Sequence, residues 1–118
     1  MHYNSGGKAI LAHLPTSEVE SIIDTHGLPA RTAQTITDRE RLLAELDRIE
    51  AQGYALNRSE DLAGIHAVGV PLIVDGEVRG ALSVAGPAHR MSRDRCEGPI
   101  LDQLRAATDE IDLTLAYR

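Results

Sequence analysis

A glycine pair followed by a lysine, Gly6-Gly7-Lys8, has the residue types of a phosphate-binding loop. Such a loop needs a serine or threonine directly after the lysine to hold magnesium, and it lies between a strand and a helix. Here the next residue is Ala9, and no strand is predicted before the glycines. The stretch is therefore interpreted as a glycine turn that enters a helix.

Ser83 and His66 are the residues that a hydrolase would use in this chain. A nucleophile elbow reads G-x-S-x-G, but Ala81 and Ala85 stand where the two glycines are required. No convincing acid accompanies the pair. Ser83 is interpreted as a strand serine, and we expect the protein not to be an enzyme.

The histidines and the single cysteine predict neither a metal site nor a cofactor. The histidines form no i, i+4 pair and do not cluster with acids. Cys96 alone cannot make a disulfide framework or a cysteine zinc cluster, and a reducing cytoplasm is the expected location. Arg93 and Arg95 flank this thiol and could lower its pKa, but a lone cysteine of this kind is interpreted as inert.

Length and composition indicate one small domain with an aliphatic core. The chain has 118 residues, 42% of them hydrophobic, with three tyrosines and no phenylalanine or tryptophan. A net charge of -6 argues against direct contact with nucleic acid, which requires a basic face. No apolar run approaches the roughly 18 residues of a membrane span, and the first residues lack the basic-then-apolar pattern of a signal peptide, so none is expected. We expect residues 1–118 to form a single domain.

Two apolar runs that meet at Asp75-Gly76 predict the central hairpin of a sheet. The runs are Ile65–Val74 and Val78–Ala85, and they hold a single charged residue, Arg79. Strands this apolar are covered on at least one face. The glycines that would let a ligand or another backbone come close are Gly69, Gly80 and Gly86.

Amphipathic segments on both sides of this hairpin predict helices. A short helix is expected over Ala9–Leu14. Two capping boxes predict the starts of the next two helices, which should end at Gly27 and Gly53. The boxes pair Ser17 with Glu20 and Thr37 with Glu40.

The remaining elements complete a small α+β domain. Tyr54–Leu56 is expected to form a short strand, and the stretch from Pro87 to Glu97 to form a loop. Pro99 suits the first turn of a last helix, whose apolar stripe is Ile100, Leu104, Ala107, Ile111 and Leu115. About three strands are near the minimum for a stable sheet, so strands this apolar suggest either strands missing from this chain or a second chain beside them.

Four stretches together resemble the C-terminal effector-binding domain of IclR-family transcription regulators. HYNSGGKAILAHLP resembles that family's H-x-x-x-x-GKA-x-LA-x-LP segment, and TAQTITDRERLLAELDRIEAQGYA resembles its T-x-x-T-I-x-D run that ends in GYA. The hairpin resembles a G-I…P-I-x-D-x-x-G…ALSV-x-GP pattern, and Arg90 matches an arginine that follows it. The order and spacing of these pieces extend through nearly the whole chain.

The resemblance implies a GAF-like fold, a curved antiparallel sheet flanked by helices, that binds a small organic effector. In the family this domain follows a winged helix-turn-helix that binds operator DNA as dimers and tetramers. A homo-oligomer is therefore expected here. Neither the helix-turn-helix nor the first part of the effector domain matches this sequence, so the chain is expected to be the C-terminal part of an effector domain.

The resemblance also implies an effector site. Members that hold small carboxylates use backbone amides of the loop that matches Ser5-Gly6, an acidic side chain at Asn57, a thiol at Ala67, and hydroxyls at Ser83 and Ala85. Ala67 and Ala85 lack those polar atoms in this chain. Because a buried polar ligand needs its partners, the effector is different, or larger and more apolar, or the site is inactive.

The hairpin must have a particular register for this site to form. A two-residue turn at Asp75-Gly76 pairs residue 67 with residue 84, which places Ala67 and Ser83 on opposite faces. A three-residue loop, Val74-Asp75-Gly76, or otherwise a bulge near Pro71, would return them to one face. We predict one of these two features.

Two functions remain open from the sequence besides the hydrolase. The first is an effector-sensing domain that controls DNA binding by a helix-turn-helix outside this chain. The second is a stand-alone partial domain that acts as a dimerisation or interaction module without an effector, its sheet edge completed by another chain.

Overall fold

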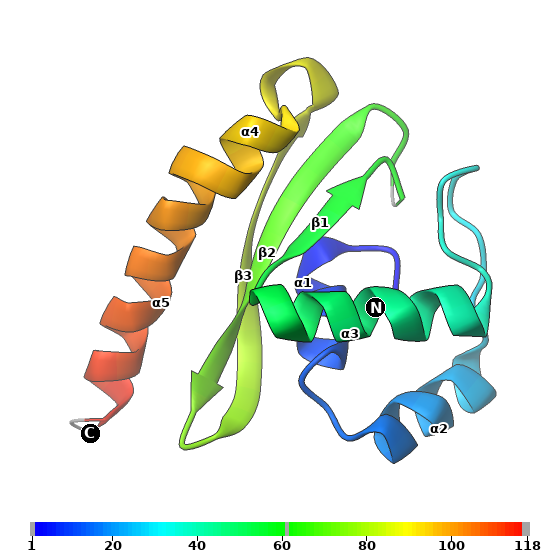
Figure 1. The fold of residues 1–118 in the computed structure, drawn as a ribbon, viewed down its shortest axis with the longest axis horizontal. Coiled ribbons are helices and arrows are strands. Elements are labelled where there is room, and N and C mark those ends of the chain that lie inside the picture. Colours follow the sequence, from blue (N-terminus) through cyan, green and yellow to red (C-terminus); the bar gives the residue numbers. More distant parts are fainter. Residues whose placement is uncertain (1, 61, 117–118) are drawn as a thin grey trace.

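The computed structural model describes residues 2–60 and 62–116, with side chains described as far as residue 111. Short helices precede and follow a small sheet (Figure 1). The elements are α1 (Ser5–Leu11), α2 (Thr16–His26), α3 (Arg39–Gln52), β1 (Ala55–Arg58), β2 (Ile65–Val74), β3 (Glu77–Pro87), a 3₁₀ turn (Ala88–Arg90), α4 (Arg93–Arg95), a π turn (Cys96–Ile100) and α5 (Leu101–Ala116). No helix in this described part is long and apolar enough to cross a membrane.

The sheet consists of three antiparallel strands in the order β1-β2-β3, which confirms the α+β prediction. β2 and β3 form the predicted hairpin. Asp75 and Gly76 both have positive φ, 54° and 78°, and they form the two-residue turn that suits the right-handed twist of a hairpin. The predicted three-residue loop is therefore wrong.

A bulge in β3 corrects the register that this turn sets. Between Leu72 and Ile73 the pairing shifts by one residue, and Arg79 of β3 is the residue skipped. The bulge lies next to Pro71, where the sequence analysis placed it as the alternative to a longer loop. With the two-residue turn and no bulge, Ala67 would pair with residue 84; with the bulge it pairs with Ala85. From the bulge onward, each β3 side chain therefore points to the opposite face of the sheet.

Helices cover both faces of the sheet (Figure 1). α5 lies on one face, and α1 lies on the other, with α3 beside it and α2 farther out (Figure 1). The core under α5 is formed by Val68, Val70, Met91, Cys96, Leu101 and Leu104. The core on the α1 side includes Ala9, Leu11, Val19, Ile23, Leu42, Leu46, Ile49 and Ala55.

α1 approaches the sheet closely because β2 has a glycine beneath it. A Cβ atom at Gly69 would lie 2.7 Å from the backbone carbonyl carbon of Ser5 and 2.8 Å from its oxygen. Real side chains do not tolerate such distances, so only glycine fits there. This confirms the expectation that another backbone approaches the sheet at Gly69.

The two predicted capping boxes are wrong, although the helices they head are present. α2 begins after Pro15 without a side-chain cap, so Ser17 already lies inside the helix. The cap of α3 is Asp38, whose carboxylate accepts a hydrogen bond from the Arg41 amide at 3.0 Å, and not Thr37. Any short side chain with an oxygen can cap, and here the acidic residue one position later makes the bond.

Glycines end these two helices as predicted. Gly27 follows α2 with φ of 68°, and Gly53 follows α3 with φ of 86°. α1 starts four residues before the predicted Ala9, because Asn4 caps it by accepting a hydrogen bond from the Gly7 amide at 2.5 Å.

The segment between Pro87 and Glu97 is largely helical rather than the predicted loop. It contains the 3₁₀ turn, α4 and the start of the π turn. Pro99 lies inside that π turn, so α5 begins after it at Leu101. Leu104 of the predicted stripe is buried. Leu101, which the predicted stripe did not include, is also buried. Leu115 lies outside the described side chains.

Candidate functional site

Three of the predicted site residues form a row across the sheet. Asn57 of β1 pairs with Ala67 of β2, and Ala67 pairs with Ala85 of β3. Directly paired residues point to the same face. Asn57 and Ala67 are buried, whereas Ala85 is exposed on β3. The row therefore runs from the interior of the domain to its open side.

The other three residues lie one step along the same face. Gly69 pairs with Ser83 and carries the backbone of Ser5. The Cα of Gly6 lies over Ala81 of β3, since a Cβ built on it would be 3.7 Å from the Ala81 Cβ. Ser5 is buried and Ser83 is exposed. The first turn of α1 thus lies over β2 and β3 beside the Ser83 position.

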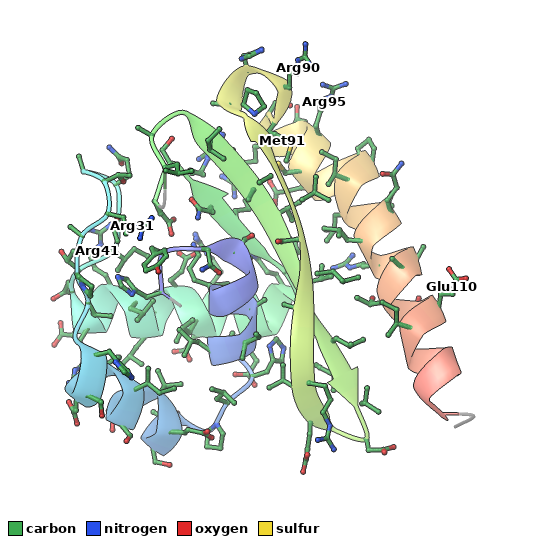
Figure 2. The ribbon with its side chains drawn as sticks, turned by 180° about the vertical axis from the view of Figure 1, so that it is seen from behind. Arg31, Arg41, Arg90, Met91, Arg95 and Glu110 are labelled. Carbon is green, nitrogen blue, oxygen red and sulfur yellow. The ribbon has the colours of Figure 1, made fainter. Side chains whose placement is uncertain are left out.

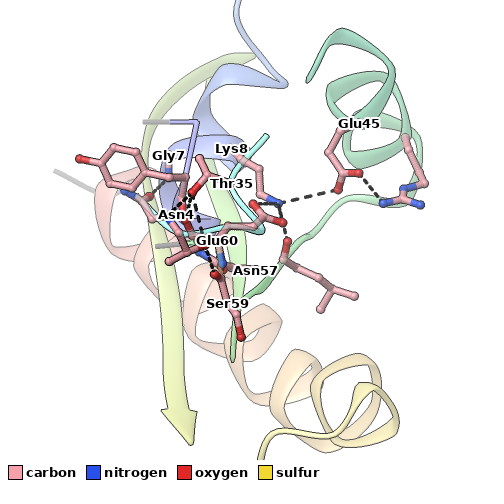
Figure 3. Close-up of polar contacts among 12 residues, drawn as sticks. Asn4, Gly7, Lys8, Thr35, Glu45, Asn57, Ser59 and Glu60 are labelled. Atoms are coloured by element: carbon pink, nitrogen blue, oxygen red, sulfur yellow. Dashed lines mark hydrogen bonds and ion pairs between the residues drawn. The ribbon is translucent and has the colours of Figure 1, made fainter. Parts of the chain in front are cut away.

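The side-chain amide of Asn57 is used to hold the chain together. Its nitrogen donates to the Tyr3 carbonyl at 2.5 Å, and its oxygen accepts from the Glu60 amide at 2.8 Å (Figure 3). These bonds tie the segment before α1 to the turn after β1. Asn57 is 4% exposed, so these bonds satisfy a buried amide that would otherwise be costly.

Lys8 is fully buried and joins α1 to β1 and to the turn after it (Figure 3). Its Nζ donates to the Leu56 carbonyl at 2.5 Å and to Glu60 Oε1 at 3.1 Å, and it lies 2.9 Å from Glu60 Oε2. Glu45 Oε1 of α3 lies 3.8 Å away. The ammonium is therefore occupied by carboxylates, which agrees with the rejection of a phosphate loop.

Burial raises the pKa of the Glu60 carboxyl, and the charge and hydrogen bond of Lys8 oppose that rise. The carboxylate of Glu45 raises this pKa further. Among the described residues, the ion pair with Lys8 is the only polar interaction of the buried Oε2 of Glu60. The two charged groups of Lys8 and Glu60 are thus buried together, where each would be costly without the other.

Two threonines in the segment before α3 form hydrogen bonds with the turn that follows β1. The Thr32 hydroxyl donates to the Ser59 carbonyl at 2.5 Å, and the Thr35 hydroxyl donates to the Glu60 carbonyl. The Thr35 oxygen also accepts from the amides of Arg31 and Thr32, at 3.0 and 2.9 Å. No local sequence pattern predicted this network of hydrogen bonds. The family-like T-x-x-T spacing was its signal.

On the opposite face of the sheet, the described side chains make few hydrogen bonds. His66 Nδ1 lies 3.4 Å from the Met91 carbonyl, and the Cys96 thiol lies 3.7 Å from the same oxygen. Burial raises the pKa of the Cys96 thiol, which disfavours the reactive thiolate. No group of three histidine, cysteine or acidic side chains suited to a metal occurs within the described residues.

A second polar cluster lies beside the π turn. The Tyr54 hydroxyl donates to Glu97 Oε2, and Arg93 Nε donates to Glu97 Oε1 at 2.6 Å. These hydrogen bonds lower the pKa of the Glu97 carboxyl, while the bond to Glu97 raises the pKa of Tyr54. Arg90, which matched the family arginine, is exposed at the turns after β3, away from α1 (Figure 2).

The fold and the sequence together define a regulator domain. The family model described as the bacterial transcriptional regulator IclR C-terminal domain matches residues 1–113. The chain belongs to this family, as the resemblance in the sequence indicated. The family and the relatives it matches are transcriptional regulators and not enzymes.

Relatives and solved structures agree with this assignment. The HTH-type transcriptional repressor AllR of Klebsiella pneumoniae is 35% identical over 96 residues, which are 80% of this chain and 35% of AllR. The inducer-binding domain of PobR from Acinetobacter, a double mutant in complex with 3-hydroxybenzoic acid, superposes with a TM-score of 0.89 at 28% identity, covering 94% of this chain and 64% of that one. The IclR of Thermotoga maritima superposes with a TM-score of 0.89 at 31% identity, covering 97% and 46%.

The chain spans about a third of the length of AllR and about half of the Thermotoga maritima protein. It matches the effector-binding part of such regulators.

Proposed function

We propose that residues 1–118 act as a single domain that senses a small organic effector and thereby controls DNA binding by another part of a transcriptional regulator. The observation that carries this proposal is the position of the first turn of α1 over β2 and β3, beside Ser83. The six residues that the resemblance implies, Ser5, Gly6, Asn57, Ala67, Ser83 and Ala85, lie around this place. The 3-hydroxybenzoic acid complex of the PobR domain supports it. A regulator of transcription in a bacterium would act in the cytoplasm.

The groups left free at this place suggest the chemistry of the effector. Asn57 already binds Tyr3 and Glu60, and Ala67 and Ala85 offer only methyl groups. The Ser83 hydroxyl and the amides of Ser5 and Gly6, which have no partner inside the helix, remain for a polar ligand. We propose a small carboxylate whose remainder is apolar and contacts the two alanines.

Titration calorimetry with 3-hydroxybenzoate and other small aromatic and aliphatic carboxylates tests this proposal. A hydrogen bond to a charged group is worth about 1.5–3 kcal/mol, so Ser83→Ala should weaken binding about 10- to 100-fold. Ser21→Ala, at an exposed position on α2, is the matched control and should bind as the unaltered chain does. If the Ser83→Ala variant binds every carboxylate as tightly as the unaltered chain does, the proposal is contradicted.

The outer edge of β3 favours a second function, an interaction module that forms a homo-oligomer. In the described chain no strand pairs with this edge, and it is apolar over 80–86. Natural sheets usually protect such an edge with charges or prolines. Pairing with a strand of a second copy would complete it.

Light scattering on matched variants tests this second function. Val84 on β3 and Ile73 near the hairpin turn are 40% and 39% exposed. Val84→Lys should reduce the mass of an oligomer joined through β3, whereas Ile73→Lys should not. If both variants keep the mass of the unaltered chain, β3 is not the contact. Neither substitution removes a group of the proposed effector site.

A further inference from the structure

A cavity of about 410 Å³ lies between α1, α2 and α3, apart from the site on the sheet. Its floor is made of Leu11, Ile23 and Leu42, which are 3%, 7% and 0% exposed. Protein interiors are packed with few voids larger than a water molecule. A hollow of this size that reaches core side chains is therefore a feature in its own right, and its volume lies in the range of ligand pockets.

None of the six residues of the proposed effector site lines this cavity. Gly27 and Pro29 of the loop that follows α2 line it and are exposed. Figure 1 places α2 below α1 and α3, on the side of α1 away from the sheet. A ligand here would contact the helices and not β3.

The lining of the cavity is apolar and contains no acidic side chain, lysine or arginine. Aliphatic side chains from all three helices form the walls, and Tyr3 and His26 also line the cavity. A charged ligand among these side chains would lose its hydration, and no acidic side chain, lysine or arginine of the lining would compensate its charge, which is costly. The cavity therefore suits an uncharged molecule.

His2 adds one polar side chain to this lining. Its Nε2 lies 3.0 Å from the Pro29 carbonyl, and His2 is 6% exposed. A carbonyl oxygen can only accept, so Nε2 carries the proton, and Nδ1 of the neutral ring is an acceptor. Burial lowers the pKa of His2, which favours the neutral ring.

We propose that this cavity binds a small uncharged molecule that has an aromatic or branched aliphatic body and one hydroxyl group, which donates to Nδ1 of His2. The apolar body would fill the space above Leu11, Ile23 and Leu42 and restore the contacts that an empty hollow lacks. The proposal does not depend on the carboxylate site, since the two share no residue.

A titration of the 118-residue chain with p-cresol, followed by methyl NMR, tests the proposal. The expected shifts are confined to methyl groups that line the cavity, such as those of Leu11 and Leu42. 4-Methylanisole has the same shape near the ring but no hydroxyl proton, so it should bind about 2- to 10-fold more weakly, the value of one neutral hydrogen bond. His2→Phe should remove this difference between the two compounds.

Two filling variants and a control locate the binding. Ile22→Trp places an indole in the cavity wall and should abolish the p-cresol shifts, and Leu28→Trp serves if the first variant does not fold. Leu62→Trp, at a 57% exposed position outside the cavity, should leave them unchanged.

Three results would overturn the proposal. They are an absence of cavity shifts at millimolar p-cresol, unchanged binding by a folded filling variant, and shifts confined to the methyls of Ala67 and Ala85. The last result would place the compound on the sheet, and it would favour the effector site while excluding the cavity.

Discussion

The two faces of the sheet hold their helices in different ways. On the α5 face, Val68 and Val70 pack against Leu101 and Leu104 in an apolar layer. On the α1 face, the helix backbone lies on a glycine, and buried polar groups tie it to β1 and to the turn that follows (Figure 3). One face is joined mainly by burial, and the other by burial together with directed bonds.

This difference bears on where a ligand site can be precise. Apolar burial is non-directional, so it holds a helix near a sheet without fixing each atom. Hydrogen bonds and a buried ion pair fix positions because their energy falls steeply with distance and angle. The α1 face is therefore suited to hold backbone amides in place, and α5 serves to close the core.

The largest effect should come from removing the buried ammonium with Lys8→Met. This change leaves the Glu60 carboxylate buried without its partner, which costs about 3–5 kcal/mol when one member of a buried pair is lost. Urea denaturation measures the free energy of unfolding. The control Arg48→Met removes the 62% exposed partner of Glu45 and should change it by less than about 0.5 kcal/mol.

The double variant Lys8→Met with Glu60→Gln sharpens this test. It removes both charges, so the uncompensated carboxylate no longer exists, and part of the lost stability should return. A Lys8→Met variant as stable as the Arg48→Met control would show that the α1 face is not held by this pair.

Removing an apolar side chain under α5 should lower the free energy of unfolding by about as much, but without disturbing the α1 face. Leu104 is 6% exposed, and Leu104→Ala should lower the free energy of unfolding by about 2–5 kcal/mol. Leu62→Ala, at an exposed position, should have little effect. NMR shifts of the Ser5 and Gly6 amides should stay unchanged in Leu104→Ala, because α5 acts on the other face. Shifts at these amides would erase the distinction between the faces.

Local patterns in the sequence predicted the elements of this fold well. Asp75-Gly76 marked the hairpin turn, and Gly27 and Gly53 marked helix ends, because each needs a positive φ that other residues adopt with difficulty. The resemblance to the family named six residues, which single motifs could not have done. Four of them, Asn57, Ala67, Ser83 and Ala85, share one face of the sheet, and Ser5 and Gly6 of α1 lie over it.

The polar core of the α1 face was not predictable in the same way. Lys8 is in a motif that suggests a loop, and its partner Glu60 is 52 residues away. Burial of a lysine depends on which distant carboxylate meets it, and no local pattern carries that information. The bulge at Arg79 was predicted only as an alternative to a three-residue hairpin loop. Either feature puts Ala67 and Ser83 on the same face, so the sequence could not decide between them.

A smaller effect is expected from a methyl group placed between α1 and the sheet. Gly69→Ala puts a Cβ 2.7 Å from the Ser5 backbone, so the helix must shift, at a cost of about 1–3 kcal/mol. Gly80→Ala, where a Cβ meets nothing within 4 Å, is the matched control in β3. Urea denaturation compares the two. Equal stabilities would mean that α1 is free to move on the sheet.

The smallest effects should appear in the pH dependence, where a carboxyl on each face gives the opposite sign. The folded state raises the pKa of Glu60, so it binds that proton more tightly than the unfolded chain does. The contribution of Glu60 to stability is therefore greatest below its ordinary pKa and declines as pH rises through the raised value. For Glu97 the folded state lowers the pKa, so its contribution is present above the ordinary pKa and is lost as pH falls through the lowered value.

Free energies of unfolding of the unaltered chain, Glu60→Gln and Glu97→Gln, measured from about pH 3 to pH 8, separate these contributions. The stability of the unaltered chain relative to Glu60→Gln should fall as pH rises, and its stability relative to Glu97→Gln should rise. Both slopes should be modest, because Lys8 opposes the shift at Glu60 and solvent screens the partly exposed Glu97. Slopes of the same sign would mean that the polar groups on the two faces sit in similar surroundings, and the contrast between the two faces would fail.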